Sequence, residues 1–511
     1  MALHEPQMNP GSRIPWVLAG ATTLFHVLTS GRGGIFRDEL YYLACSEHLG
    51  FGYVDQPPFA ALVTWFARHV FGDSLHGLRL LPAVAAGATV LLTAAMTRRL
   101  GGGRYAQTLA AWLTALAPAY VSSFGYLSMN AFDVLFWAAA LCVLIRILVD
   151  DTPRMWLVFG LIAGLGLQNK LSMAFLGIGV AAGLLLSRSW HHLRNRWLWL
   201  GGGIALLVFM PHVAWQAVHG WPVREFMANA MGEKNVALSP LGYLQMWAMQ
   251  MNPAAVPVAL AGLALLLVLP AGRPWRALGW ASIVIVVLLM SQRTKPYYLS
   301  PLYTLLFASG SVVLARVAAR PRWGWLRAAT VALCGASAIP VAPFAKPLLA
   351  SEDYVAYSAR LGIAPRAEEN HDMGRLPQFF ADRIGWPELA ATVAQVFATL
   401  TPEEREHACI FGHNYGQAGA IDFYGPALGL PKAISGHNSY FLWGPRGCRG
   451  DVVVVIDGDR DDLEEVFESV ALATVYTCQD CMPYENDKPI WVCRRLRLPF
   501  ESLWPRVRSY G

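Results

Sequence analysis

The chain has 511 residues, of which 55% are hydrophobic and 14% are charged. Because soluble proteins carry about 25% charged residues, this composition excludes a disordered chain, a collagen-like fibre and a small disulfide-stapled domain, and it disfavours a purely soluble enzyme. Residues 1–349 hold 25 Lys and Arg against 11 Asp and Glu, a net charge of +14, whereas residues 350–511 hold 15 against 23, a net charge of −8. This split predicts basic membrane-flanking loops followed by an acidic soluble tail, and not a nucleic-acid-binding surface.

Apolar windows in the first two thirds of the chain predict about eleven membrane spans, since a helix needs roughly 20 apolar residues to cross a bilayer. The window at 155–169 is short and fits either a half-span or the tilted partner of the next span. The expected spans are 14–31, 76–97, 105–123, 131–149, 155–169, 171–187, 197–217, 254–270, 277–291, 298–316 and 325–343.

Basic residues set the expected orientation, because Lys and Arg favour the cytoplasmic side of a membrane. With a cytoplasmic N-terminus every even-numbered loop is basic, and an odd number of spans places the tail outside the plasma membrane; ten or twelve spans would keep it in the cytoplasm. The first apolar run predicts a retained span, with a cleaved signal peptide as the alternative. The basic residues of the even loops are Arg98, Arg99, Arg104, Arg154, Arg188, Arg194, Arg196, Arg273, Arg276, Arg316, Arg320 and Arg322.

The first outer loop, residues 32–75, predicts two short amphipathic helices in the membrane interface, one near 40–49 and one over 59–70. This loop carries five of the eleven carboxylates of the first 349 residues. Asp38 and Glu39 follow the first span directly, where a desolvated carboxylate is costly and is therefore a candidate functional group. A solvated interfacial pair is the alternative interpretation.

Other charged residues fall at the outer ends of later spans. Asp133 lies at the start of the fourth span and is either a functional acid or a helix N-terminal carboxylate stabilised by the macrodipole. Lys170, Arg293 and Lys295 place positive charge on the outside, against the usual orientation rule. They fit either the anchoring of lipid headgroups or the binding of an anionic phosphate.

Aromatic residues accompany these charges. Tyr297 and Tyr298 fit a membrane aromatic belt as well as a sugar-binding wall. The outer turn PHVAWQAVHGWP (211–222) combines His219 with a second histidine and two tryptophans, and it fits a structural turn, a sugar site or a metal site. No dinucleotide fingerprint, P-loop or nucleophile elbow occurs in its required context, and GGGR at 101–104 predicts a cytoplasmic turn.

The tail, residues 350–511, predicts a small α/β domain because short apolar runs alternate with helical patterns. Its polar-aromatic segment 436–445 fits either a lid over the membrane site or a packed surface loop. The expected strands are 407–412, 451–458, 472–478 and 490–495, and the expected helices are 418–425 and 461–470.

Five of the eight cysteines lie in the tail. Disulfides among them are expected if the tail faces an oxidising compartment. Cys478 and Cys481 form a C-x-x-C motif, which fits a redox pair or half of a zinc site, and the sequence has no second such motif.

Six motifs follow one another in the membrane part: RDELYY, YVDQPPF, SMNAFDVLFW, QNKLSM, PHVAWQAVHGWP and KPYYLSPLY. Their order and spacing resemble the GT-C glycosyltransferases of family 39, the superfamily of protein O-mannosyltransferases and lipid A aminoarabinose transferases, in its bacterial RgtA/B/C/D-like branch. The tail segments NYGQAGAIDFYG and SGHNSYFLWGP are similar to the domain that follows in many such bacterial proteins. The resemblance implies a polytopic α-helical GT-C domain over residues 12–345 and an extracytoplasmic α/β domain over residues 350–511.

The same resemblance implies transfer of a sugar from a polyprenyl-phosphate donor to an acceptor hydroxyl at the outer face of the plasma membrane. It makes Asp38 the general base with Glu39 beside it, and Asp133 a second acidic position. Gln56 departs from the Lys or His of some relatives, which weakens one expected phosphate or metal contact. The residues that the resemblance assigns to substrate binding are Asp55, Gln56, Lys170, His219, Arg293, Lys295, Tyr297 and Tyr298.

The expected partners are the lipid-linked sugar, membrane lipids and a glycan, lipid or protein acceptor, without nucleic acid. No motif requires a cofactor and no residue is assigned as a metal ligand, although dependence on a divalent metal ion stays open. A transporter or flippase of lipid-linked sugar is the main alternative, and a non-catalytic scaffold is another. A transporter predicts carboxylates at span centres and paired broken helices, whereas the acids here fall at span ends and in loops.

Overall fold

The chain folds into two compact units that interleave along the sequence. A computed structural model describes residues 11–150, 152–234, 236, 238–292, 294–365 and 369–511. The first unit comprises residues 1–31, 70–214 and 237–348, and the second comprises residues 32–69, 215–236 and 349–511. The division predicted from the sequence follows chain order, whereas two loops of the predicted membrane part, 32–69 and 215–236, belong to the same compact unit as the tail.

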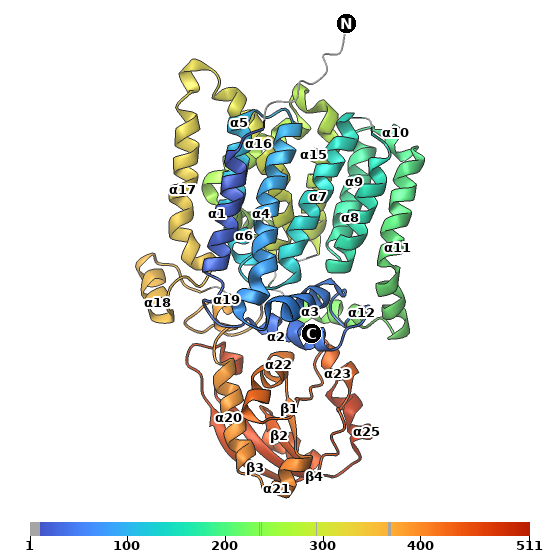
Figure 1. The fold of residues 1–511 in the computed structure, drawn as a ribbon, viewed down its shortest axis with the longest axis vertical. Helices are drawn as coiled ribbons and strands as arrows, with labels where there is room; N and C mark the ends of the chain where they lie inside the picture. Colours follow the sequence, from blue (N-terminus) through green and yellow to red (C-terminus); the bar gives the residue numbers. More distant parts are fainter. Residues whose placement is uncertain (1–10, 151, 235, 237, 293, 366–368) are drawn as a thin grey trace. The chain divides into compact units, whose positions relative to one another are not determined.

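The first unit is a helical bundle whose helices α1, α4, α7, α8 and α9 run side by side (Figure 1). Helix α15 packs against α9, and α14 packs against α16. Apolar side chains such as Trp137, Leu176 and Ile285 form its buried core. The helices are α1 Ile14–Leu28, α4 Leu75–Arg99, α5 Arg104–Leu116, α6 Pro118–Ser123, α7 Met129–Asp150, α8 Met155–Asn169, α9 Met173–Leu186, α10 Trp190–Leu193, α11 Arg196–Val218, α13 Pro240–Met251, α14 Val256–Leu267, α15 Arg276–Ser291, α16 Tyr303–Val317 and α17 Leu326–Ala345.

Among the described residues, six helical segments are long and apolar enough to cross a membrane. A seventh span results if α13 and α14, which meet at an angle of 97°, are counted together. The predicted windows at 14–31, 155–169 and 171–187 fall on the shorter apolar helices α1, α8 and α9. Every predicted window therefore falls on helical structure, while the total of eleven spans stays a prediction.

The predicted span at 105–123 is interrupted, because α5 ends at Leu116 and α6 begins at Pro118. Proline has no amide hydrogen and disfavours helical backbone at the preceding residue, and Ala117 accordingly has the extended conformation. Pro118 therefore divides a window that hydropathy alone reads as continuous.

The second unit contains the two short helices expected in the first outer loop, which are α2 and α3. Their residues 37–47 and 59–71 agree closely with the expected ranges 40–49 and 59–70. The expected amphipathic character is wrong for α2, because its residues 39–46 are all buried. The helices of this unit are α2 Arg37–Glu47, α3 Phe59–Phe71, α12 Pro222–Asn229, α18 Ser351–Arg360, α19 Gln378–Ala381, α20 Trp386–Ala398, α21 Pro402–His407, α22 Tyr415–Tyr424, α23 Ser439–Trp443, α24 Arg460–Val466 and α25 Phe500–Leu503.

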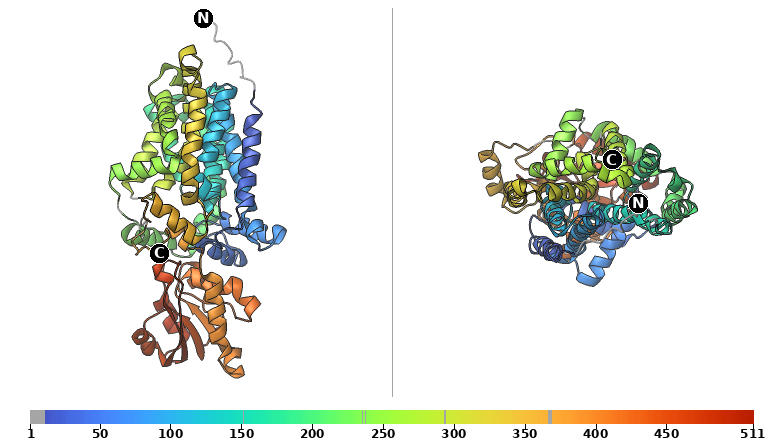
Figure 2. Two further views of the ribbon diagram at one scale, coloured as in Figure 1. Left: turned by 90° about the vertical axis from the view of Figure 1, so that its left-hand side faces the viewer. Right: turned by 90° about the horizontal axis from the view of Figure 1, so that it is seen from above.

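A four-stranded sheet with the order β1-β2-β4-β3 forms the core of the tail (Figure 2). The strands are β1 Cys409–Gly412, β2 Val452–Ile456, β3 Phe467–Tyr476 and β4 Lys488–Leu496. Strands β1 and β2 are parallel, and β4 pairs antiparallel with both β2 and β3. All five residues of β2 are buried, as expected for a central strand covered on both faces.

The predicted helix at 461–470 is wrong over its last four residues. Helix α24 ends at Val466, and Phe467 begins the edge strand β3, pairing with Leu496 of β4. The acidic run 461–465 has a helical pattern, but the strand partner of Phe467 and Val470 decides the conformation that follows.

Two disulfides stabilise the tail, as expected from its cysteine content. Cys409 of β1 is bonded to Cys448, and Cys478 is bonded to Cys481. The C-x-x-C motif therefore holds a disulfide here, and Cys493 is a buried free thiol.

Candidate active site

Helix α2 presents Asp38 at its first turn. The half-buried carboxylate of Asp38 accepts a hydrogen bond from the Tyr415 hydroxyl, with 2.8 Å between Oδ1 and the phenol oxygen. The neighbouring Glu39 is fully buried and accepts a hydrogen bond of 2.9 Å from the Phe36 amide. That bond satisfies a donor at the helix start, so the geometry of Glu39 favours a structural role over a catalytic one.

Arg37, Asp38, Asp382, Tyr415, Tyr484 and Glu485 form a buried polar group that we call the Asp38 cluster. The Arg37 guanidinium lies over the Tyr415 ring, 4.7 Å from its centroid, and over the Tyr484 ring at 5.3 Å. The Tyr484 hydroxyl donates a hydrogen bond of 2.6 Å to Asp382. Arg37 thus interacts with two carboxyl groups, those of Asp382 and Glu485, and with two phenols.

Burial shifts the two inner carboxyl groups of this cluster toward their neutral forms. Burial raises the pKa of Asp382 to about 6, and the Arg37 charge only partly opposes it. Burial also raises the pKa of Glu485, again against Arg37 and against hydrogen bonds from Gln417 and Asn414. A protein interior disfavours the charged form of an acid, so this excess of acid can take up a proton near neutral pH.

Asp55 lies close to the same helix. It accepts a hydrogen bond of 2.8 Å from the Tyr41 hydroxyl, which is also 2.7 Å from Ser439 Oγ. Segment 436–445 therefore packs against the first-loop helices through Ser439, at the start of α23. Gln56 is buried, and its Nε2 lies 3.9 Å from the Cys45 sulfur. The structure brings Asp38 and Asp55 together through the packed rings of Tyr41 and Tyr415, whose centroids are 4.9 Å apart.

A second buried polar group lies in the first unit, and we call it the Lys170 cluster: Asn130, Asp133, Lys170, Ser172 and Tyr298. Lys170 ends α8, and its ammonium donates a hydrogen bond of 2.7 Å to Asn130 Oδ1. The ammonium also lies 4.1 Å from the centroid of the Tyr298 ring. Among the residues that the structure describes, no carboxylate forms an ion pair with Lys170, so its remaining donors are available to an anion.

Asp133 accepts a hydrogen bond of 2.5 Å from the Ser172 hydroxyl and interacts electrostatically with Lys170. Tyr297 packs edge-on against Tyr298, with 4.8 Å between ring centroids, and lies 5.5 Å from the Lys170 ammonium. Lys295 precedes the 3-10 turn 296–302 that carries both tyrosines. Arg293 lies outside the described residues. The structure therefore brings Asp133, Lys170, Tyr297 and Tyr298 together.

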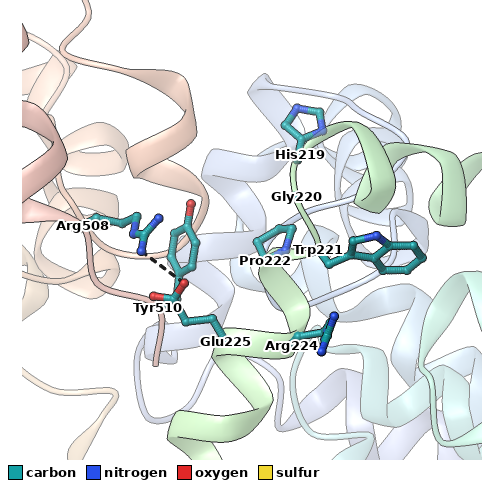
Figure 3. A pocket seen from close by; sticks show the side chains of 8 residues that line it. All are labelled: His219, Gly220, Trp221, Pro222, Arg224, Glu225, Arg508 and Tyr510. Carbon is teal, nitrogen blue, oxygen red and sulfur yellow. Dashed lines mark ion pairs between the residues drawn. The ribbon is translucent and has the colours of Figure 1, made fainter.

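His219 lines an open cavity of about 410 Å³ in the second unit (Figure 3). Its Nδ1 lies 2.8 Å from the Trp215 carbonyl oxygen, and its ring stacks on the Trp215 indole at 4.0 Å. The Arg508 guanidinium forms an ion pair of 3.3 Å with Glu225 across the cavity. The cavity residues are His219, Gly220, Trp221, Pro222, Arg224, Glu225, Arg508 and Tyr510. Arg508 and Tyr510 had not been expected from the sequence, because they lie almost 300 residues after His219 along the chain.

Within the described part of the chain, no group of three or more His, Cys, Asp or Glu side chains is arranged to hold a metal ion.

The sequence does not indicate the inner part of the Asp38 cluster, which consists of Arg37, Asp382, Tyr415, Tyr484 and Glu485. Arg37 and Tyr415 lie in motifs that carry the family resemblance, but neither motif indicates that the other is its neighbour.

Residues 55–215 match the family model described as dolichyl-phosphate-mannose-protein mannosyltransferase, a segment that includes Asp133 and Lys170 but not Asp38. ArnT from Cupriavidus metallidurans bound to undecaprenyl phosphate superposes with a TM-score of 0.62 at 15% identity, covering 94% of this chain and 98% of ArnT. The apo form of that ArnT gives a TM-score of 0.61 at 16% identity, covering 93% and 97%. The chain has the GT-C glycosyltransferase fold.

The GT-C fold class predicted from the sequence is thereby confirmed. Arabinofuranosyltransferase AftD from Mycobacteria shares the GT-C architecture with a TM-score of 0.52 at 15% identity, covering 95% of this chain and 40% of AftD. A search of curated protein sequences gives no match.

Proposed function

We propose that this GT-C protein transfers a sugar from a polyprenyl-phosphate donor to an acceptor hydroxyl, with Asp38 as general base. The observation that carries the proposal is the fold similarity to ArnT with bound undecaprenyl phosphate, which extends over 94% of the chain. The environment of Asp38 supports it, because Tyr415 occupies one carboxylate oxygen while the side chain stays half-buried and not enclosed.

In the proposed step the acceptor oxygen bonds to the anomeric carbon of the sugar as the bond from that carbon to the phosphate oxygen breaks. The phosphate leaves with the bonding electron pair, and Asp38 takes the proton of the acceptor hydroxyl. Base catalysis of this kind contributes about 10²–10⁴-fold to the rate. We assign Glu39 a structural role beside Asp38, because it accepts the amide hydrogen of Phe36 at the start of α2.

The leaving phosphate gains negative charge, and we assign its stabilisation to Lys170. An ammonium held by one amide oxygen and an aromatic ring keeps further donors for phosphate oxygens. Lys295, Tyr297 and Tyr298 are the neighbouring candidates for lipid-phosphate or sugar contacts, and Asp133 is proposed to orient Ser172 and to balance the lysine charge. The sequence-based roles of Asp55, Gln56 and Arg293 in substrate binding stay predictions.

The cavity lined by His219 is proposed as an acceptor-binding site. Its volume of about 410 Å³ lies in the range typical of small-molecule sites, about 300–1,000 Å³. The indole of Trp221 and the charged side chains of Arg224 and Arg508 offer a stacking surface and hydrogen-bond donors that suit a saccharide (Figure 3). A His219→Ala variant is then expected to raise the KM for the acceptor while kcat stays unchanged.

The protein is proposed to lie in the plasma membrane with its N-terminus in the cytoplasm and its tail outside. Two disulfides in the tail support an oxidising environment for that part. Labelling of a cysteine introduced in the tail by a membrane-impermeant maleimide in intact cells tests this orientation.

The test of the function is incubation of the purified protein in nanodiscs with a panel of polyprenyl-phosphate sugars. Released polyprenyl phosphate and a glycosylated acceptor are the expected products. Movement of the intact lipid-linked sugar across proteoliposomes, without release of polyprenyl phosphate from any panel member, would overturn the proposal and favour a flippase.

A further inference from the structure

The contact between Asp38 and the tail is specific to one carboxylate oxygen. Tyr415 donates a hydrogen bond of 2.8 Å to Oδ1 of Asp38. Within the part of the chain that the structure describes, Asp38 has no second hydrogen bond and no ion pair. Oδ2 is thus the oxygen that remains to accept a proton, and the phenol fixes the direction in which it points.

Tyr415 is itself held on three sides. The Arg37 guanidinium lies 4.7 Å from the ring centroid on one side, and the rings of Tyr41 and His437 lie at 4.9 Å on others. The Tyr415 amide also donates a hydrogen bond of 3.3 Å to His437 Nδ1. Only 8% of Tyr415 is exposed, so its hydroxyl has little freedom to move relative to α2.

Helix α22, which begins at Tyr415, packs closely against α2. A β-carbon at Gly416 would lie 2.9 Å from Arg37 Cγ, and one at Gly419 would lie 2.9 Å from Leu40 Cβ. The absence of side chains at these two positions allows the helices to approach each other. Separations this short mean that the two backbones fix each other's position.

The start of α22 is also fixed from the sheet side. The Asn414 side chain caps the helix by accepting hydrogen bonds from the Gly416 and Gln417 amides, at 2.8 and 3.1 Å. Glu485 accepts hydrogen bonds from Asn414 Nδ2 at 2.8 Å and Gln417 Nε2 at 2.9 Å. The position of the Tyr415 hydroxyl is therefore set by the folded tail and not by a mobile loop.

The Tyr415 phenol is suited to act as a hydrogen-bond donor that keeps its proton. Burial raises the pKa of Tyr415 well above its usual value, and the Asp38 charge raises it further. The hydroxyl therefore keeps its proton at neutral pH and donates it toward the carboxylate.

We propose that Tyr415 is a positioning residue for the general base, holding Asp38 through Oδ1 so that Oδ2 receives the proton of the acceptor hydroxyl. The C-terminal domain then contributes to the site directly, because one of its residues sets the position of the base. This inference rests on the proposed function of Asp38, and the experiment below separates the two.

The decisive variant is Tyr415→Phe in the full-length protein, which keeps the ring and its packing but removes the hydroxyl. Because a hydrogen bond to a charged group contributes about 1.5–3 kcal/mol, kcat is expected to fall about 10–10²-fold with the KM for the donor unchanged. Tyr440→Phe is the matched control, since the buried Tyr440 hydroxyl donates a hydrogen bond of 3.0 Å to a different carboxylate, Asp422. This control is expected to keep the wild-type kcat.

The double variant with Asp38→Asn tests whether Tyr415 acts through Asp38. Removing the phenol hydroxyl is expected to cost nothing further once the carboxylate is gone, whereas a general structural role would lower the activity in both backgrounds. Turnover is read with the panel donor that the wild-type protein uses. Wild-type kcat in Tyr415→Phe, together with an inactive Asp38→Asn, would overturn this inference alone. Full activity of Asp38→Asn would overturn the proposed base and the inference together.

A stability measurement keeps the inference testable without turnover. Melting temperatures of the wild type, the two single variants and the double variant form a thermodynamic cycle. The loss from Tyr415→Phe is expected to be smaller in the Asp38→Asn background. Equal losses in both backgrounds would show that the two side chains are not coupled, which would overturn the inference.

Discussion

In the Asp38 cluster the Arg37 guanidinium interacts with two carboxyl groups, Asp382 and Glu485, whereas in the Lys170 cluster one ammonium is held by an amide oxygen and two aromatic rings. The first arrangement has more acidic groups than basic ones, and burial raises the pKa of Asp382 to about 6 and also raises the pKa of Glu485. The second leaves a cation without an ion-paired carboxylate among the described residues. A region that can accept protons and a region that can bind an anion are the two capacities that transfer of a sugar from a lipid phosphate requires.

The largest effect is expected from a substitution that removes the Asp38 carboxylate of the first region. Asp38→Asn keeps the shape of the side chain but cannot take a proton, so kcat should fall about 10²–10⁴-fold with the fold intact. Glu47→Gln is the control on the same helix, since Glu47 forms ion pairs with Arg68 at 3.1 Å and with Lys432 at 2.7 Å. Steady-state release of polyprenyl phosphate measures both, and equal turnover of Asp38→Asn and the wild type would remove Asp38 from the mechanism.

The next largest effect is expected from a substitution that removes the Lys170 ammonium of the second region. Lys170→Met keeps most of the apolar side chain but removes the ammonium that lies over Tyr298, so kcat/KM for the donor should fall about 10²–10³-fold. Inhibition by free undecaprenyl phosphate should weaken in parallel, because the phosphate loses its counter-ion. Lys488→Met is the control, since Lys488 is paired with Asp457 at 2.8 Å in the sheet domain. Unchanged kinetics and unchanged inhibition would show that Lys170 is not a phosphate ligand.

Stability gives a comparison within the tail, because its two disulfides close loops of very different length. The Cys409–Cys448 disulfide closes a separation of 39 residues around β1, so replacing both cysteines by serine should cost about 2–4 kcal/mol and lower the melting temperature of the tail. The Cys478–Cys481 disulfide spans three residues, and its serine double variant should cost much less. Differential scanning fluorimetry under non-reducing conditions compares the two, and equal losses would contradict the loop-length argument.

The smallest expected effect is a dependence of stability on pH in the first region. Asp382 has a pKa of about 6 in the folded protein against about 3.9 in an unfolded chain. Between these values the folded state binds more protons, so its stability falls as pH rises from about 4 to 6, by about 2–3 kcal/mol for this group alone. Asp382→Asn should remove that part of the pH dependence.

The measurement is the melting temperature of wild type and Asp382→Asn from pH 4 to pH 7, with Asp372→Asn as an exposed control. The difference between wild type and Asp382→Asn should change in favour of the variant as pH rises. A difference that stays constant across this range would show that Asp382 does not titrate there.

Much of this fold can be predicted from local sequence. Apolar windows locate the bundle helices, and the period of apolar residues locates α2 and α3 within a few residues. Asp38 stands out because it lies at the start of an acidic loop that follows an apolar run, and Lys170 because it is a cation between two such runs. These signals depend only on neighbours along the chain.

The features of the fold and site that the sequence does not predict depend on contacts between distant segments. Tyr415 lies 377 residues after Asp38, and no local pattern marks it as the partner of α2. The change from α24 to β3 at Phe467 likewise depends on pairing with Leu496, because the residues before it have a helical pattern. Side-chain partners and strand ends are therefore set by tertiary contacts that a single sequence does not reveal.

The discontinuity of the second unit has a consequence for biogenesis. Helix α2 leaves the ribosome 377 residues before Tyr415, which at about 5–20 residues per second corresponds to roughly 20–75 s of synthesis. During that interval the nascent chain holds Asp38 without its phenol and Arg37 without the carboxylates of the tail. The environment of the proposed base is therefore completed only after translation has passed the last apolar helix, so a ribosome that stalls earlier leaves a protein whose Asp38 cluster is unfinished.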